Sequence, residues 1–169
     1  HRIPGRITSG QQAEGAARGP HWLAADRRQQ RRLRRMRRRV AWREPVLDEW
    51  IDYNGHVSEP YYVLVLGFAT DAVMDAVGLD PDYRAATDSS LYTVEAHVRY
   101  LREVPPGVEL ETRSEVIGHT GKLLRLWHEL WADGVLRATE EILGVHVTAG
   151  RSTAFPAEVL TRIEDLQVP

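Results

Sequence analysis

The sequence predicts an α+β domain over residues 40–169, and three features of that region indicate the class. One long segment is apolar nearly all round, as in a buried helix. It is followed by several segments in which apolar and polar residues alternate, as in strands. Short turn sequences join these segments. Antiparallel strands that are linked by short turns and follow one long helix are typical of the α+β class.

The first element is a short strand over Val40 to Leu47, interrupted at Pro45. A turn segment follows, in which Asn54-Gly55 is a strong turn dipeptide. We therefore expect the chain to reverse direction before the long helix begins.

The long helix is predicted over Glu59 to Val77. Ser58 is a suitable N-cap residue, Pro60 suits the first turn, and Gly78 is a typical stop. The few small or polar positions form one narrow stripe: Gly67, Asp71 and Asp75. Because the rest is apolar, we expect the sheet to wrap around this helix.

Four strands and a terminal helix complete the predicted domain. In the first strand, Tyr92, Val94, Ala96, Val98 and Tyr100 are expected on one face, with Thr93, Glu95, His97 and Arg99 on the other. The Asp133-Gly134 dipeptide predicts a hairpin turn. The strands are Leu91–Leu101, Val108–Ile117, Lys122–Ala132 and Val135–Thr148, and the helix is Phe155–Ile163.

The charge is divided unevenly between the two parts of the chain. Residues 1–40 hold 12 arginines and two acids, a net charge of +10, whereas residues 41–169 hold 10 basic residues and 22 acids, a net charge of −12. A block of like charge repels itself, so residues 1–39 are predicted to be a disordered basic extension or tag. A nucleic-acid-binding arm is the alternative, although the acidic domain makes nucleic acid an unexpected partner.

Composition removes several classes of protein. The chain has no cysteine, which excludes disulfides, Cys-ligated zinc and thiol nucleophiles. No apolar run has the length of a membrane span, and no secretory signal is evident, so a cytoplasmic protein without membrane partners is expected. No GxGxxG, phosphate-binding loop or GxSxG motif occurs. We expect His119, His128 and His146 to be hydrogen-bonded strand or turn residues, and no metal site.

Two groups of residues are candidates for chemistry. The first is Asp52-x-Asn54-x-His56, directly before the helix N-terminus. It offers a carboxylate base, an amide donor and an imidazole, beside backbone N–H groups that could stabilise a developing oxyanion. The alternative is a plain helix-capping turn.

The second candidate is Glu95, followed by His97, on the first predicted strand after the helix. A carboxylate in a half-buried strand has a raised pKa when it is desolvated, which suits a general base near neutral pH. The alternative is an outward-facing charge in ordinary strand alternation.

Two segments resemble a known family. Residues 50–62, WIDYNGHVSEPYY, and residues 93–102, TVEAHVRYLR, with the following Pro-Pro-Gly turn, are similar to the signatures of hotdog-fold acyl-CoA thioesterases of the 4-hydroxybenzoyl-CoA thioesterase-like superfamily. The resemblance covers about residues 40–150. Within the family, the sequence looks most like the betainyl-CoA thioesterases of carnitine breakdown. One departure is Ser58, where relatives usually carry Asn.

The resemblance implies a fold, a reaction and a site. The fold is an antiparallel sheet of about five strands wrapped around one central helix, and the reaction is hydrolysis of an acyl-CoA to a free acid and coenzyme A. Sites in this family lie between subunits, which implies a homodimer or a higher oligomer. No cofactor is implied, since coenzyme A is part of the substrate. The implied catalytic residues are Asp52, Asn54, His56 and Glu95, and the implied substrate-binding residues are Ser58, Tyr61, Tyr62 and His97.

Some alternatives remain open at this point. Either Asp52 or Glu95 could activate water or attack the thioester directly. A non-catalytic acyl-CoA-binding protein, or a thioesterase for another short, medium-chain or aromatic acyl-CoA, would carry much the same sequence.

Overall fold

The computed structural model describes Gln29 and residues 39–168. The predicted basic extension over residues 1–39 therefore lies outside the described residues, apart from Gln29 and Arg39. The fold below is that of residues 39–168.

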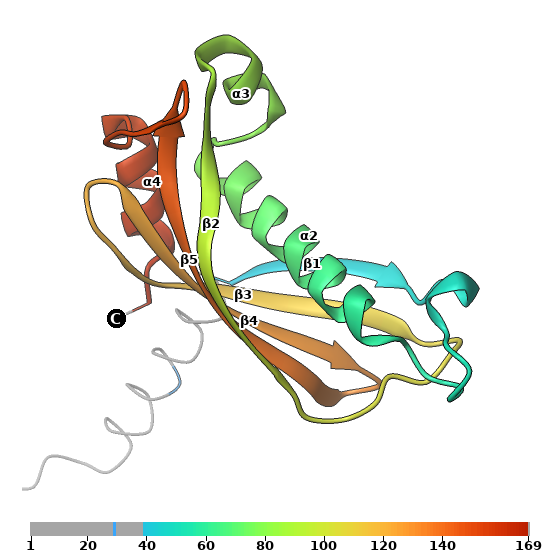
Figure 1. The fold of residues 1–169 in the computed structure, drawn as a ribbon. Coiled ribbons are helices and arrows are strands. Elements are labelled where there is room, and N and C mark those ends of the chain that lie inside the picture. Colours follow the sequence, from blue (N-terminus) through green and yellow to red (C-terminus); the bar gives the residue numbers. More distant parts are fainter. Residues whose placement is uncertain (1–28, 30–38, 169) are drawn as a thin grey trace, which may run out of the picture. The chain divides into compact units, whose positions relative to one another are not determined.

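A curled antiparallel sheet forms one layer of the fold (Figure 1). The strand order is β1-β3-β4-β5-β2, with the short β6 paired to β5. The predicted class is confirmed, and β1 ends at Pro45 rather than Leu47. The strands are β1 (Val40–Pro45), β2 (Ser89–Tyr100), β3 (Glu109–His119), β4 (Leu123–Ala132), β5 (Val135–Thr148) and β6 (Arg151–Ser152).

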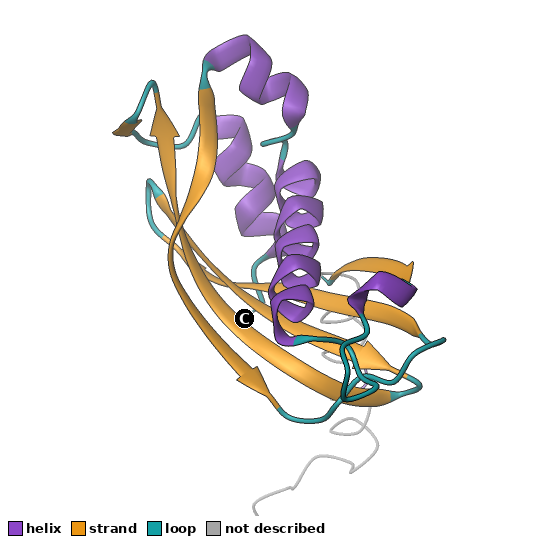
Figure 2. Cartoon of the chain, turned by 45° about the vertical axis from the view of Figure 1, so that its right-hand side comes forward, coloured by secondary structure: helices purple, strands orange, loops and turns teal. Residues whose placement is uncertain are grey.

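Helix α2 (Glu59–Val77) lies against the concave face of this sheet (Figures 1 and 2). Its bounds are those predicted, and it ends at Gly78, which adopts the left-handed conformation with φ of 82°. Seven of its side chains are buried: Tyr62, Val65, Leu66, Ala69, Thr70, Val73 and Val77.

The other side of α2 is less covered than the sequence predicts. Val63 and Leu64 are 47% and 42% exposed, so the sheet of a single chain covers one face of the helix and does not wrap it completely. By length and hydropathy alone α2 would also qualify as a membrane-spanning helix. Its seven buried side chains instead identify it as the core helix of this fold.

Three shorter helices lie within residues 39–168. The 3₁₀ helix η1 (Asp48–Trp50) precedes the turn. Helix α3 (Pro81–Thr87), which the sequence pattern did not predict, begins at Asp80, whose side chain accepts a hydrogen bond from the Tyr83 N–H at 2.8 Å. Helix α4 (Ala157–Leu166) is the predicted terminal helix, shifted by a few residues.

Strand β2 is an edge strand with a β-bulge. Its register with β5 shifts between Thr93 and Glu95, so the predicted alternation along the whole strand is wrong at Val94. After the bulge, Val98 and Tyr100 are on the helix side of the sheet, where Val98 packs against the core and the Tyr100 ring meets Tyr62. Residues 92–97 are exposed, and among the described residues no strand pairs with the outer edge of β2.

Candidate functional site

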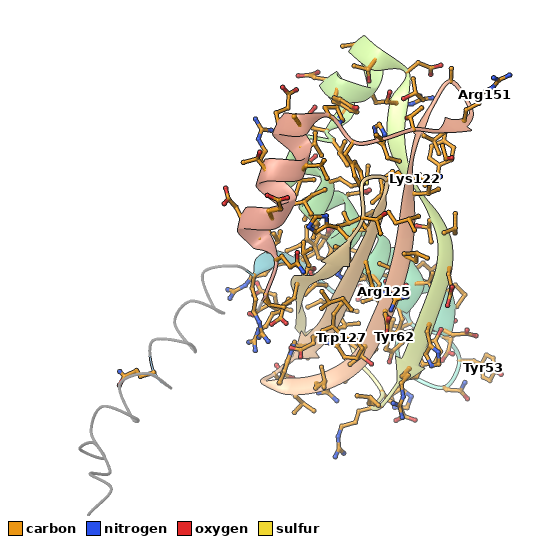
Figure 3. The ribbon with its side chains drawn as sticks, turned by 90° about the vertical axis from the view of Figure 1, so that its left-hand side faces the viewer. Tyr53, Tyr62, Lys122, Arg125, Trp127 and Arg151 are labelled. Carbon is orange, nitrogen blue, oxygen red and sulfur yellow. The ribbon has the colours of Figure 1, made fainter. Side chains whose placement is uncertain are left out.

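The Asp52–His56 segment forms a tight turn just before α2. The Asp52 N–H donates to the His56 carbonyl at 3.0 Å, and the Gly55 N–H donates to the Asp52 carbonyl at 3.0 Å. Gly55 has φ of 83°, a conformation that favours glycine. Tyr53 at the tip is 97% exposed and projects away from the strands (Figure 3). The turn thus places the three candidate side chains, Asp52, Asn54 and His56, within five residues.

The Asp52 carboxylate is held by Asn54. One carboxylate oxygen accepts from the Asn54 N–H at 2.8 Å, and the other lies 3.4 Å from the Asn54 side-chain amide. These contacts fix the direction of a partly buried carboxylate. They also turn the Asn54 amide toward Asp52, so its role in the single chain is to orient a possible base rather than to offer a free oxyanion donor.

The His56 imidazole has a partner that the sequence did not predict. Its Nε2 lies 3.1 Å from Oε2 of Glu103, in the loop that follows β2. The hydrogen on Nε2 then points to the carboxylate, which leaves Nδ1 as the free ring nitrogen. No sequence signal links residues 56 and 103, because the pairing depends on β2 returning to the start of α2.

The start of α2 offers few backbone donors. Ser58 is at the N-cap position as predicted, but its side chain makes no capping hydrogen bond. Pro60 has no N–H, and the Tyr61 N–H donates to the Ser58 carbonyl at 3.1 Å. Among the hydrogen bonds of the described residues, the Glu59 N–H and the Ser58 hydroxyl remain available at the positive end of the helix.

A cavity of about 590 Å³ lies beside this helix start. Tyr62 and Tyr100 contact each other edge to face across it, with ring centroids 5.4 Å apart. The Tyr100 hydroxyl donates to Oε1 of Glu59 at 3.0 Å, and burial is the main cause that raises the Tyr100 pKa. The lining residues are Val57, Glu59, Tyr62, Tyr100, Leu101, Arg102 and Glu103.

The two tyrosines that the sequence assigned to substrate binding differ in their surroundings. Tyr62 lines the cavity, but its hydroxyl accepts from the Val104 N–H at 2.9 Å, and burial raises its pKa. Tyr61 stacks on the buried Trp50 ring with centroids 5.6 Å apart. Tyr61 therefore has a packing role in the single chain, whereas Tyr62 presents its ring to the cavity.

Glu95 and His97 lie apart from the turn. Both are exposed on β2, and no hydrogen bond or ion pair within residues 39–168 joins them to Asp52, Asn54 or His56. Glu95 is five residues from Tyr100, which corresponds to about 17 Å along a strand. A single chain therefore gathers the turn residues and Tyr62 at one place and leaves Glu95 and His97 on the strand edge.

The predicted structural role of the strand histidines is confirmed for two of them. His128 lies within 2.7 Å of the Ser114 hydroxyl and 3.1 Å of the Thr70 hydroxyl, and His146 lies 2.9 Å from the Tyr83 hydroxyl. Within the part of the chain that the structure describes, no group of three or more histidines and acids is arranged to hold a metal ion.

Three comparisons relate the chain to known proteins. The model of the thioesterase-like superfamily matches residues 46–163. A betainyl-CoA thioesterase from Pseudomonas aeruginosa is 42% identical over 131 residues, which cover 75% of this chain and 82% of the relative. An L-carnitine dehydrogenase/betainyl-CoA thioesterase from Agrobacterium fabrum is 44% identical over 120 residues, which cover 69% of this chain and 25% of that longer protein. A Staphylococcus aureus protein solved in complex with CoA has a TM-score of 0.73 at 25% identity, and the match covers 76% of this chain and 83% of that chain.

Proposed function

Because this chain belongs to the thioesterase-like superfamily and is an acyl-CoA thioesterase, we propose that its substrate is betainyl-CoA and that hydrolysis takes place at the start of α2. The reaction consumes one water and releases glycine betaine and coenzyme A. The similarity to two proteins named for betainyl-CoA hydrolysis supports the choice of acyl group. The names of the fused relatives also connect the reaction with L-carnitine breakdown.

The observation that carries the location is the Asp52 carboxylate, which accepts from the Asn54 N–H at 2.8 Å shortly before the N-terminus of α2. Glu59 and Tyr62 of that helix start line the cavity. In the proposed reaction Asp52 takes a proton from the attacking water. The oxygen then adds to the thioester carbonyl and forms a tetrahedral oxyanion. The Glu59 N–H, the Ser58 hydroxyl and the helix dipole stabilise that charge. The C–S bond breaks as the carbonyl re-forms, and the thiolate of coenzyme A leaves.

His56 is suited to the second half of the reaction. Its Nε2 lies 3.1 Å from Oε2 of Glu103, and this contact orients the ring. A protonated imidazole can donate a hydrogen bond to the oxyanion or a proton to the leaving thiolate. Both half-reactions use only water and side chains of the chain, so the proposal includes no cofactor.

We further propose a homodimer that forms through the β2 edge. A 12-residue edge strand with exposed Tyr92 and Val94 is a surface that soluble proteins normally cover. Pairing of two β2 strands would place Glu95 and His97 at the subunit boundary, where they could act on a substrate bound at either protomer. Glu95 is then the alternative base to Asp52.

Coenzyme A requires cationic groups near the cavity mouth, and Arg102 is the arginine among the cavity-lining residues. Its guanidinium is suited to the phosphates of the nucleotide part. An enzyme that uses CoA thioesters and carries no cysteine fits a cytoplasmic location, which remains part of the proposal.

A panel of thioesters tests the substrate. Release of free thiol would be measured for betainyl-CoA, acetyl-CoA, butanoyl-CoA and benzoyl-CoA with the wild-type protein. The proposal predicts the highest kcat/KM for betainyl-CoA. A preference for a neutral straight-chain thioester would exclude betainyl-CoA as the substrate and leave the thioesterase activity intact. Tight binding without thiol release would indicate a non-catalytic protein.

A further inference from the structure

A row of three buried polar side chains crosses the sheet on its helix side. Ser114 on β3 is opposite His128 on β4, and His128 is opposite Glu140 on β5. They are 1%, 0% and 3% exposed. This row separates two apolar clusters of the core, which contain Leu110, Leu130 and Ala138 on one side and Val116, Leu126 and Ile142 on the other. A polar group buried between apolar clusters is costly unless it is hydrogen-bonded, so each member requires a partner.

His128 has its partners. Its Nδ1 lies 2.7 Å from the Ser114 hydroxyl, and its Nε2 lies 3.1 Å from the hydroxyl of Thr70 on α2. Burial lowers its pKa to about 4, so the ring is neutral near pH 7. The His128 part of the row is therefore complete and uncharged.

One carboxyl oxygen of Glu140 lacks a partner among the described residues. Its Oε2 is fully buried and has no hydrogen-bond partner among the described residues. Burial raises the pKa of this carboxyl to about 7. In native proteins a buried polar atom of this kind is uncommon and calls for an explanation, such as an ordered water, an ion, a ligand or a catalytic role.

Burial alone accounts for the raised pKa of Glu140, and no cationic side chain contributes to it. On β4 Glu140 faces His128, which is neutral, and on β2 it faces Val98. Its negative charge is one of the lesser causes that raise the Tyr100 pKa. On α2, the Glu59 carboxylate accepts a hydrogen bond from the Tyr100 hydroxyl at 3.0 Å. The other α2 acids, Asp71 and Asp75, belong to its C-terminal half. Two arginines of this region have other places: Arg137 donates to the Glu103 carbonyl at 2.7 Å and acts on Tyr62, and Arg102 lines the cavity.

This combination matches one kind of ligand. Tyr100 lines the 590 Å³ cavity. Because Val98 is opposite Glu140 and Tyr100 is opposite Ala138, Tyr100 and Glu140 are diagonal neighbours on the helix side of the sheet. The Tyr62 and Tyr100 rings offer π faces and edges at the same place. Aromatic rings together with a desolvated carboxylate favour a quaternary ammonium group, which cannot donate hydrogen bonds and is weakly hydrated.

We propose that Glu140 is a specificity-determining residue that binds the cationic end of the acyl group, with Tyr62 and Tyr100 packed around it. This inference rests on the proposed function and adds to it the residue that distinguishes a charged acyl group from a neutral one of the same shape. The trimethylammonium group supplies the positive charge that the protein leaves out around Glu140. Glu140 has no role in the attack on the carbonyl.

The test compares two substrates that differ only in charge. Betainyl-CoA carries a trimethylammonium group, and 3,3-dimethylbutanoyl-CoA has a carbon atom in place of that nitrogen. In the wild type, kcat/KM should favour the charged substrate by at least about tenfold. Glu140→Gln should lower kcat/KM for betainyl-CoA by at least about tenfold and change the neutral substrate by no more than about twofold.

Glu141→Gln is the matched control. It makes the same chemical change at the next position of β5, where the carboxylate is 43% exposed and pairs with Arg125 at 3.3 Å. The control should keep the preference of the wild type. If Glu140→Gln keeps it too, or if Glu59→Gln removes it in place of Glu140→Gln, the inference is wrong.

A second measurement needs no variant. The ratio of the two kcat/KM values cancels every group that acts on the carbonyl, including Asp52 and His56. The pH dependence of kcat/KM reports the pKa values of the free enzyme. The ratio should therefore rise with pH and level off above about pH 7, as the Glu140 carboxyl ionises. A ratio that stays flat from about pH 5.5 to 8 would overturn the inference.

The outcomes separate the two proposals. A wild type that hydrolyses betainyl-CoA best, with a preference that Glu140→Gln does not alter, contradicts the inference alone. A wild type that favours the neutral substrate contradicts both the inference and the proposed betainyl-CoA substrate. A wild type that hydrolyses neither thioester contradicts the proposed function. In that case binding of tetramethylammonium, measured by its effect on the Glu140 pKa in carboxyl NMR spectra, still decides the inference: a lowered pKa supports it and an unchanged pKa excludes it.

Discussion

Replacing Glu140 with glutamine should stabilise the ligand-free protein, and the gain should depend on pH. The carboxyl is 3% exposed and its pKa is raised from 4.5 to about 7 by burial. A raised carboxyl pKa means that the folded state holds its proton more tightly than the unfolded state. The ionised form therefore destabilises the fold, and this penalty appears as pH rises from about 4.5 to 7.

The size of the effect follows from the pKa difference. A shift from 4.5 to about 7, at 1.36 kcal/mol per unit, corresponds to about 3 kcal/mol above pH 7 and to almost nothing below pH 4. Glutamine has the shape of the neutral acid and no charge at any pH. The free energy of unfolding of Glu140→Gln should therefore match the wild type near pH 4 and exceed it by up to about 3 kcal/mol near pH 8.

Urea unfolding at a series of pH values measures this difference. Both proteins must be studied at one protein concentration, since the stability of an oligomer depends on it. His128 titrates with the opposite sign: its pKa is lowered to about 4, so its contribution is lost as pH falls from 6.5. It is present in both proteins and cancels in the difference. Glu141→Gln is the control for the same chemical change at an exposed position of β5. A flat difference between wild type and Glu140→Gln would refute the assignment of Glu140 as a buried, unpartnered carboxyl.

Three further predictions concern the helix and the strand edge. Thr70→Val should lower the free energy of unfolding by about 1–3 kcal/mol because it leaves a buried nitrogen of His128 without a partner, whereas Thr70→Ser keeps the hydroxyl and should cost less. Gly78→Ala should cost about 1–2 kcal/mol at its φ of 82°, while Gly67→Ala, whose added carbon meets nothing within 4 Å, should stabilise α2 by about 0.5–1 kcal/mol; thermal unfolding of both variants checks this. Val94→Lys should shift the proposed dimer toward monomer in light scattering, and an unchanged mass would contradict pairing through β2.

The parts of the fold that sequence predicts well are those with local signals. The first and last residues of α2 were predicted correctly because Pro60 and Gly78 lie at the two ends of a continuous apolar run. The Asp52–Gly55 turn was predicted because Asn54-Gly55 is a typical turn dipeptide. The positions of β2, β3, β4 and β5 were also predicted to within two residues, because turn sequences separate them, whereas the two-residue β6 was not predicted.

The bulge in β2 has no local signal. It appears where Thr93 pairs with Gly144 of β5, and an added carbon at Gly144 would lie 2.6 Å from the Leu91 side chain. The irregular register thus involves a contact between two strands that are neighbours in the sheet and far apart in the sequence. For this reason the predicted faces of β2 are correct after Glu95 and wrong before it.

Glu140 and Glu103 were missed for a related reason. On β5, polar residues do not mark one face. Glu140 and His146 lie on one face of the strand, and the apolar Leu143 and Val145 lie on the other. The pattern therefore does not reveal which face is buried. Glu103 acquires its role only when the end of β2 meets the turn of His56. Candidate residues on the turn itself were found, whereas their partners from other elements were not.

The measurement that most directly tests the central claim is the activity of Asp52→Asn on betainyl-CoA. The substitution keeps the shape of the side chain next to Asn54 and removes the base, so kcat/KM should fall by about 10²–10⁴. Asp48→Asn makes the same change at an exposed position of η1 and should keep kcat/KM within about twofold of the wild type. If Asp52→Asn retains wild-type turnover while Glu95→Gln loses it, the base lies on β2; if both retain it, hydrolysis does not take place at the start of α2.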